Sequence, residues 1–346
     1  MRFGLAKAAA SVLAATMAAT TLSACGSDPE NEPLVIYSNS VSDGRGEWLQ
    51  EEAAAAGFEI EFVDLGGADI QNRLIAEQAN PIADVVYGLN NIYFENLKSS
   101  GVLQPYTPAW SDQVDPSMGD GETFWPIVRE PIMLVYNDAA YTPETAPDDW
   151  PDLWEKEEYH GRYEVPRNLG GATTQLVISG ILARHFDPNG DLHVSQEGWD
   201  AIEAYFEHGV PAVEGQNLYG HMASGEVDMG QMYLAGKAAR EEEYNLPTTA
   251  VHPPVGVPMA TQQVGLVAGT DKPERAQEFI DWFGGAEFQA KWSNQFFTAP
   301  TNQEALEDAD QEAVQQTEAF EEQDIDWTIV SENLAAWIEK IELNYL

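Results

Sequence analysis

The chain has 346 residues, of which 58 are Asp or Glu and 16 are Lys or Arg, giving a formal net charge of −42. A nucleic-acid interface starts from a basic patch, and 16 dispersed cations do not supply one, so nucleic acid is excluded as a partner. The 44% hydrophobic content allows a large core, the length predicts two globular lobes, and the single Cys excludes an intramolecular disulfide.

Residues 1–24 have the pattern of a signal peptide. Arg2 and Lys7 precede an uncharged stretch too short to span a membrane, which takes roughly 18 or more apolar residues. The ending Leu-Ser-Ala-Cys resembles the bacterial lipobox, which implies that Cys25 carries the lipid that anchors an extracytoplasmic protein to the bacterial cell membrane. Ordinary cleavage beside an incidental Cys is the alternative. Residues 25–33 are polar and contain Pro, so they are expected to form a tether.

Strand-like and helix-like segments then alternate along the chain. Strands are expected at 34–37, 58–63 and 84–87, and helices at 46–56, 70–78 and 91–99. This alternation predicts an α/β fold with a parallel sheet and helices on both faces. Ligands bind beyond the carboxyl ends of such strands. The corresponding loops are Ser38-Asn39-Ser40, Gly66-Gly67-Ala68 and Leu89-Asn90-Asn91.

Strand-like and helix-like segments also alternate in the second half of the chain. Residues 124–129 and 132–136 each have the composition of a strand, and a loop at 168–174 opens a long apolar helix that reaches residue 185. Residues 225–230 and 264–267 are the last segments expected to join the parallel sheet. After Pro273 the pattern is mostly helical.

Six motifs then occur in an order that resembles the solute-binding proteins of bacterial ABC importers, in the group that includes ferric-iron, thiamine and 2-aminoethylphosphonate binders. They are LVIYS (34–38), NRLIAE (72–77) with NPIADVV (80–86), VYND (135–138), WPDL (150–153), GEVDMG (225–230) and PERAQEFIDW (273–282). Each motif alone is weak, but together they cover almost all of the chain after the tether.

The resemblance implies a two-lobed periplasmic-binding-protein fold of type II, with two hinge crossings and a helical C-terminus. Lobe 1 would comprise residues 34–128 and 260–346, and lobe 2 residues 129–259. It also implies a monomer that closes on a small-molecule solute by hinge motion and delivers it to a cognate ABC permease and its ATPase.

The loop before the apolar helix has the features of an anion receptor. Gly171, Ala172, Thr173 and Thr174 open the helix, where unpaired N–H groups, hydroxyls and the positive end of the helix dipole coincide. A plain helix cap is the alternative. Ser38, Asn39 and Ser40, with residues 43–45, form the facing loop, which is otherwise an ordinary turn. Further candidate ligand-binding residues are Gly67, Asn90, Arg129 and Tyr233, and for Arg129 a structural salt bridge is the commoner role.

The nature of the solute stays open at this stage. A phosphate- or phosphonate-bearing anion is the primary hypothesis. Thiamine or its phosphate is an alternative because residues 83–91 resemble the thiamine binders, and Tyr37, Trp125 and Tyr233 could stack on a cationic ring unless they are core residues. Ferric iron is a weaker alternative because the family's iron sites use a Tyr-Tyr pair, whereas Tyr233 is followed by Leu234.

Enzymatic readings lack support in the sequence. Metalloprotease, phosphate-loop and serine-hydrolase motifs are absent, and the six His residues show no metal-ligand spacing. Residues 187–191 begin like a calcium loop, but Leu192 replaces the required Gly and Gly198 the bidentate Glu, which favours a surface turn. We therefore expect no enzyme, cofactor or bound metal. A surface lipoprotein or adhesin without transport function is the remaining alternative of a different class.

Overall fold

A computed structural model describes residues 32–346, so the predicted signal peptide, Cys25 and most of the tether lie outside the described residues. The helices and strands are β1 (Leu34–Ser38), α1 (Arg45–Ala55), β2 (Ile60–Asp64), α2 (Gly67–Glu77), β3 (Val85–Tyr87), α3 (Asn91–Ser99), β4 (Leu103–Gln104), β5 (Phe124–Asn137), α4 (Asp152–Glu155), β6 (Glu164–Val165), α5 (Ala172–Ala183), β7 (Phe186–Asp191), α6 (Gln196–His208), β8 (Val210–Pro211), α7 (Leu218–Ala223), β9 (Met229–Tyr233), α8 (Leu234–Tyr244), β10 (Thr248–Ala250), β11 (Met259–Val267), α9 (Pro273–Phe283), α10 (Ala286–Phe296), β12 (Ala299–Pro300), α11 (Gln311–Glu318) and α12 (Trp327–Asn344). Among these described helices, none is both long and apolar enough to cross a membrane.

The main sheet confirms the α/β class but is mixed rather than parallel. Its strand order is β10-β5-β11-β3-β1-β2. β1 pairs in parallel with β2 and β3, as the alternating pattern predicted. β11 pairs antiparallel with β3 and β5, and β9 pairs antiparallel with β5. The expectation of a parallel strand at 264–267 was therefore wrong, and the strand that begins at Met229 is mainly antiparallel, with one parallel bridge to Tyr163. Both strands return alongside a crossing strand rather than after a helical crossover.

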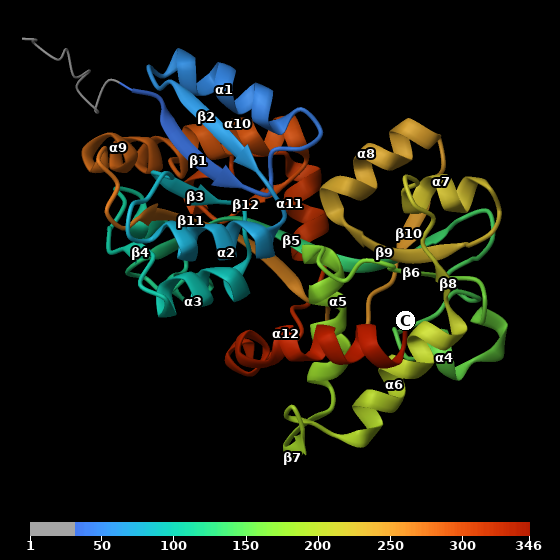
Figure 1. Ribbon diagram of the computed structural model, residues 1–346. Helices are drawn as coiled ribbons and strands as arrows, with labels where there is room; N and C mark the ends of the chain where they lie inside the picture. The colour runs from blue at the N-terminus through green and yellow to red at the C-terminus, as the bar shows by residue number, and fades with distance from the viewer. Residues whose placement is uncertain (1–31) are drawn as a thin grey trace, which may run out of the picture.

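One long strand, β5, replaces the two strands expected at 124–129 and 132–136. Its first half pairs with β11 and β12, and its second half with β9 and β10. Pro131 lies in the middle without breaking it, and the next residue, Ile132, donates its N–H to the carbonyl of Pro258 at 2.9 Å. β5 thus runs from one half of the molecule into the other, and β11 makes a return crossing beside it (Figure 1).

Buried side chains form separate cores in the two halves. On one side, β1, β3 and β11 pack against α1, α9 and α10, with a further cluster beneath α2 and α3. On the other side, α5, α6 and the second half of β5 share one cluster, and α7, α8 and β9 share another. The fully buried rings of Phe279 and Phe283 on α9 and of Trp199 and Tyr205 on α6 show that both cores rest on aromatic packing.

The last helix, α12, packs against both halves. Its buried residues Val330, Leu334 and Trp337 belong to the same apolar cluster as Leu176 of α5 and Ile92 of α3. The helical C-terminus is therefore as expected, but α12 contacts the core assigned by sequence to lobe 2 as well as lobe 1. The division into residues 34–128 with 260–346 and residues 129–259 stays a prediction.

Candidate functional site

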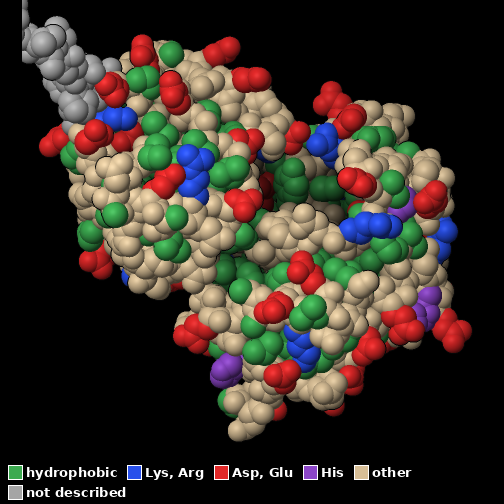
Figure 2. Space-filling model, viewed as in Figure 1, with side chains coloured by type: hydrophobic (Ala, Val, Ile, Leu, Met, Phe, Trp, Pro, Cys, Tyr) green, Lys and Arg blue, Asp and Glu red, His purple; other side chains and the backbone are tan. Residues whose placement is uncertain are grey.

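A cavity that is open to solvent lies between the two halves of the molecule, and the empty space within it, solvent included, is about 710 Å³. The loops after β1 and β3 line it on one side, and the first turn of α5 lines it on the other. The space-filling view shows the surface hollowed there, with apolar side chains in the hollow (Figure 2). Concave sites between two lobes or domains, with mixed apolar and polar linings, are where small molecules commonly bind.

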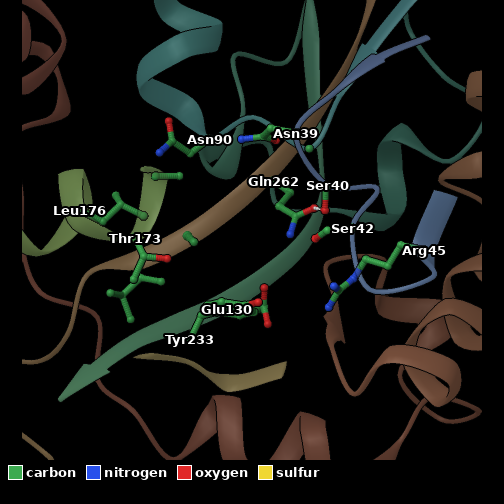
Figure 3. A pocket seen from close by; sticks show the side chains of 14 residues that line it. Asn39, Ser40, Ser42, Arg45, Asn90, Glu130, Thr173, Leu176, Tyr233 and Gln262 are labelled. Atoms are coloured by element: carbon green, nitrogen blue, oxygen red, sulfur yellow. Dashed lines mark hydrogen bonds between the residues drawn. The ribbon is translucent and has the colours of Figure 1, made fainter. Parts of the chain in front are cut away.

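Six of the eleven predicted ligand-binding residues line this cavity. They are Asn39, Ser40, Asn90, Ala172, Thr173 and Tyr233. They come from the loop after β1, the loop after β3, the start of α5 and the end of β9, which lie far apart in the sequence. The close view shows Asn39 and Ser40 on one side of the cavity and Thr173 on the other (Figure 3). Loops selected because they lie beyond the carboxyl ends of strands are therefore found on both sides of the cavity.

Three of the predicted residues lie behind the cavity wall instead. Ser38 is fully buried, and its Oγ accepts the N–H of Ser40 at 3.0 Å, so it shapes the loop. Gly67 lies beneath a ring, because an added Cβ would stand 2.7 Å from Cε2 of Tyr93. Thr174 is buried and its Oγ1 accepts a hydrogen bond from Nε2 of Gln231 at 2.7 Å. Their roles in the structure are packing and loop geometry.

Gly171 and Arg129 also lie outside the cavity lining. Gly171 precedes α5 with φ −74°, and an added Cβ would meet only Oγ1 of Thr174 at 3.9 Å. The fold itself therefore leaves room for a side chain at this position. Arg129 forms an ion pair with Glu322, which is the structural role weighed against ligand binding.

Only one of the three predicted stacking aromatics reaches the cavity. Tyr37 is fully buried and its hydroxyl donates to Glu77 at 2.8 Å. Trp125 is 5% exposed and its Nε1 donates to the carbonyl of Tyr106 at 2.7 Å. Both are core residues, as the packing alternative predicted. Tyr233 is half-buried and lines the cavity, where burial raises the pKa of its hydroxyl.

The cavity also contains residues that sequence reasoning did not select. They are Ser42, Arg45, Gly88, Glu130, Ile132, Leu176, Ala260 and Gln262. Gly88 has φ +91°, and an added Cβ would lie 2.6 Å from Cβ of Ser40, so a glycine is needed where β3 ends. Arg45, which the sequence places in the facing loop, provides the cavity with a guanidinium.

Glu130 places a buried carboxyl group in the cavity wall. The residue is 5% exposed, and its Oε1 accepts the N–H of Ala235 at 3.0 Å in the first turn of α8. Burial raises the pKa of Glu130, against the opposing effects of the Ala235 N–H, the Arg45 guanidinium and a hydrogen bond with Gln262. Figure 3 shows this carboxyl group between Thr173 on one side and Arg45 on the other.

Hydrogen-bond donors without partners point to a polar ligand. Gly171 gives α5 no side-chain cap, so the N–H groups of Ala172, Thr173 and Thr174 have no acceptor among residues 32–346. Asn90 is 5% exposed and caps α3, because its Oδ1 accepts the N–H of Ile92 at 3.2 Å. Its Nδ2 is buried and has no acceptor within the described chain. Ser40, by contrast, donates its Oγ to Oε1 of Gln262 at 3.1 Å.

The fold and this cavity together define a two-lobed periplasmic binding protein. The chain has the same fold as the ferric binding protein from Campylobacter jejuni, with TM-score 0.74, 16% identity, and coverage of 90% of this chain and 99% of that one. It also matches the periplasmic binding protein AfuA from Actinobacillus pleuropneumoniae, solved with fructose-6-phosphate bound, with TM-score 0.71, 18% identity, and coverage of 90% and 98%. At these identities the similarity shows the fold alone.

The chain belongs to the bacterial extracellular solute-binding protein family, whose model matches residues 48–322. It is 32% identical over 316 residues to the probable ABC transporter periplasmic-binding protein y4fP of Sinorhizobium fredii, covering 90% of this chain and 86% of the relative. The expected family resemblance is therefore confirmed. Because members of this family bind solutes, the chain is a solute-binding protein and not an enzyme.

Proposed function

We propose that the protein is the substrate-binding component of an ABC importer and that it captures a small solute bearing a phosphate or phosphonate group. The observation that carries the proposal is the uncapped first turn of α5, which faces Arg45 across the cavity. A helix N-terminus and a guanidinium are both preferred partners of an oxyanion. Two serine hydroxyls, of Ser40 and Ser42, border the same space.

Asn90 supports the proposal independently of the helix dipole. Leaving a buried donor without an acceptor costs about 1–3 kcal/mol. Asn90 lines the cavity, and its buried Nδ2 is in that state within residues 32–346. An oxygen of the solute would satisfy it and recover this free energy on binding. A phosphate or phosphonate has several acceptor oxygens, so it can accept from Asn90 and from the first turn of α5 together.

Ferric iron and thiamine have less support from the cavity. Within residues 32–346, no group of three or more His, Cys, Asp and Glu could hold a metal ion. Tyr233 is the only tyrosine among the lining residues, and Leu234 beside it is buried. Fe(III) binds several anionic oxygens, and a cationic ring needs aromatic faces, of which Tyr233 offers one.

We propose further that a lipid on Cys25 holds the protein outside the cytoplasm, where it meets its permease as a monomer. The lipobox-like sequence at residues 22–25 and the family assignment support this proposal. One lipid chain gives only marginal anchoring, so stable attachment needs more than one acyl chain.

The experiment is a thermal-shift panel with glycerol 3-phosphate, simple phosphonates, thiamine and its phosphates, Fe(III) and simple sugars. A ligand present at 100 times its Kd should add about 2.7 kcal/mol to the free energy of unfolding. We expect stabilisation by phosphate- or phosphonate-bearing compounds and weakening of that effect in Arg45→Gln. A stoichiometric coloured Fe(III) complex that Tyr233→Phe abolishes would instead identify an iron binder.

A further inference from the structure

A second cavity, also open to solvent, lies next to the first on the side of β6 and β8, and its empty space, solvent included, is about 1000 Å³. Its polar lining comes from Glu164, Arg167, Asn168, Glu214 and Gln231. Gln231 and Tyr233 are separated by one residue on β9, so their side chains face the same side of the strand. Their Cα atoms are about 7 Å apart. Because Tyr233 lines the first cavity, the two cavities are neighbours along β9.

Arg167 is exceptional among the cations of this protein. Of the 14 Lys and Arg side chains in residues 32–346, thirteen have a carboxylate within 4.0 Å. Arg167 is the one without a carboxylate partner in that part of the chain, although acids outnumber cations more than threefold in the sequence. Arg167 is exposed and lines the second cavity, and within residues 32–346 no hydrogen bond engages its five N–H donors.

Neighbouring amides complete a polar wall around this guanidinium. Oδ1 of Asn168 accepts the N–H of Gly170 at 2.8 Å, which leaves the amide nitrogen of Asn168 as a donor. Nε2 of Gln231 donates to Thr174, whereas Oε1 of Gln231 is buried and has no partner among the described residues. The wall therefore offers a cation with donors for an oxyanion and one acceptor for a hydroxyl.

The two acids of the lining do not neutralise Arg167. Glu164 is engaged elsewhere, since its Oε2 lies 2.7 Å from Nδ1 of the buried His221. Glu214 is exposed to solvent, where its charge is screened. Neither carboxylate lies within 4.0 Å of the Arg167 guanidinium, so the cavity retains an available positive charge.

We propose that Arg167, Asn168 and Gln231 form a second anion subsite, which receives a carboxylate or phosphate on a carbon that also bears a hydroxyl. This inference extends the proposed function. The solute would be anionic at both ends, with one end at the first turn of α5 and the other at Arg167. Arg is suited to this role because its planar fork of donors matches two oxygens of a carboxylate or phosphate.

The test compares 3-phosphoglycerate with glycerol 3-phosphate by isothermal titration calorimetry. The two probes share a phosphorylated three-carbon skeleton, and only the first has a carboxylate at the far end. Arg167→Gln should lower the affinity for 3-phosphoglycerate by roughly tenfold or more, as expected for lost hydrogen bonds to a charged group. It should leave the Kd of glycerol 3-phosphate unchanged. Arg275→Gln removes the same charge from a half-buried position on α9, outside the lining of both cavities, and should affect neither probe.

A second measurement keeps this inference separate from the proposed function. The Nε–Hε resonance of Arg167, identified by its loss in Arg167→Gln, is followed while glycerate, which has no phosphate, is added. A saturable shift supports the subsite even if neither phosphorylated probe binds, in which case the phosphate class of the proposed function is wrong. Overturning the subsite requires either no shift with glycerate and 3-phosphoglycerate, or equal affinity of wild type and Arg167→Gln for 3-phosphoglycerate.

Discussion

Asn90 performs two tasks with two different atoms, and a pair of substitutions can separate them. Oδ1 caps α3, and Nδ2 is the buried donor left for the solute. Asn90→Ser retains a good capping oxygen and removes the amide donor, whereas Asn90→Ala removes both. We therefore expect Asn90→Ser to lose affinity with little loss of stability, and Asn90→Ala to lose both.

The magnitudes follow from the two interactions. A hydrogen bond to a charged group contributes about 1.5–3 kcal/mol, so Asn90→Ser should weaken a phosphate-bearing ligand about 10- to 150-fold. The lost cap should make unliganded Asn90→Ala less stable by about 1 kcal/mol, while unliganded Asn90→Ser changes much less. Calorimetry gives the affinities, and denaturant unfolding without ligand gives the stabilities. Unchanged affinity in Asn90→Ser would refute the assignment of Nδ2 to the solute.

Three further outcomes test other parts of the protein. Thr173→Val removes one hydroxyl at nearly constant volume and should weaken the same ligand by about 1.5–3 kcal/mol in calorimetry, with unliganded stability almost unchanged; equal losses of both would indicate a capping role. Ionised Glu130 repels an anion, and burial raises its pKa, so the affinity for an anionic ligand should rise as pH falls. A Glu130→Gln variant whose affinity depends on pH as strongly as that of the wild type would contradict this. Cys25→Ser should release the protein from the membrane fraction, and unchanged fractionation of this variant would contradict the lipid anchor.

The loops that line the cavity could be predicted from the sequence better than the cavity residues that lie on strands. The turn after β1 and the start of α5 could be predicted because small polar residues and glycines interrupt apolar runs at strand-to-helix junctions. Glu130 and Gln262 lie on the crossing strands β5 and β11, where alternation does not tell which side faces a cleft. A usable signal was present, since Arg129 and Glu130 are the only charged residues between Phe124 and Tyr136.

Long-range pairing explains the remaining differences. The direction of β11 relative to β3 depends on its return along β5, which local propensity does not record. The pairing of Arg129 with Glu322 joins residues far apart in sequence, and with so many acids the partner could not be chosen in advance. The same excess of acids is what makes the unpaired Arg167 informative once the structure is known.

The position of α12 limits how the lobes can move. If β5 and β11 were the only connection, they would act as a flexible hinge and the lobes could move far apart. Opening the space between α3 and α5 would strip buried side chains of α12, including Trp337, from their apolar neighbours, at about 1.5–3 kcal/mol for each one exposed. Solute entry should therefore involve a small rotation of one lobe relative to the other, with sliding at packed helices, rather than a wide opening of the cleft.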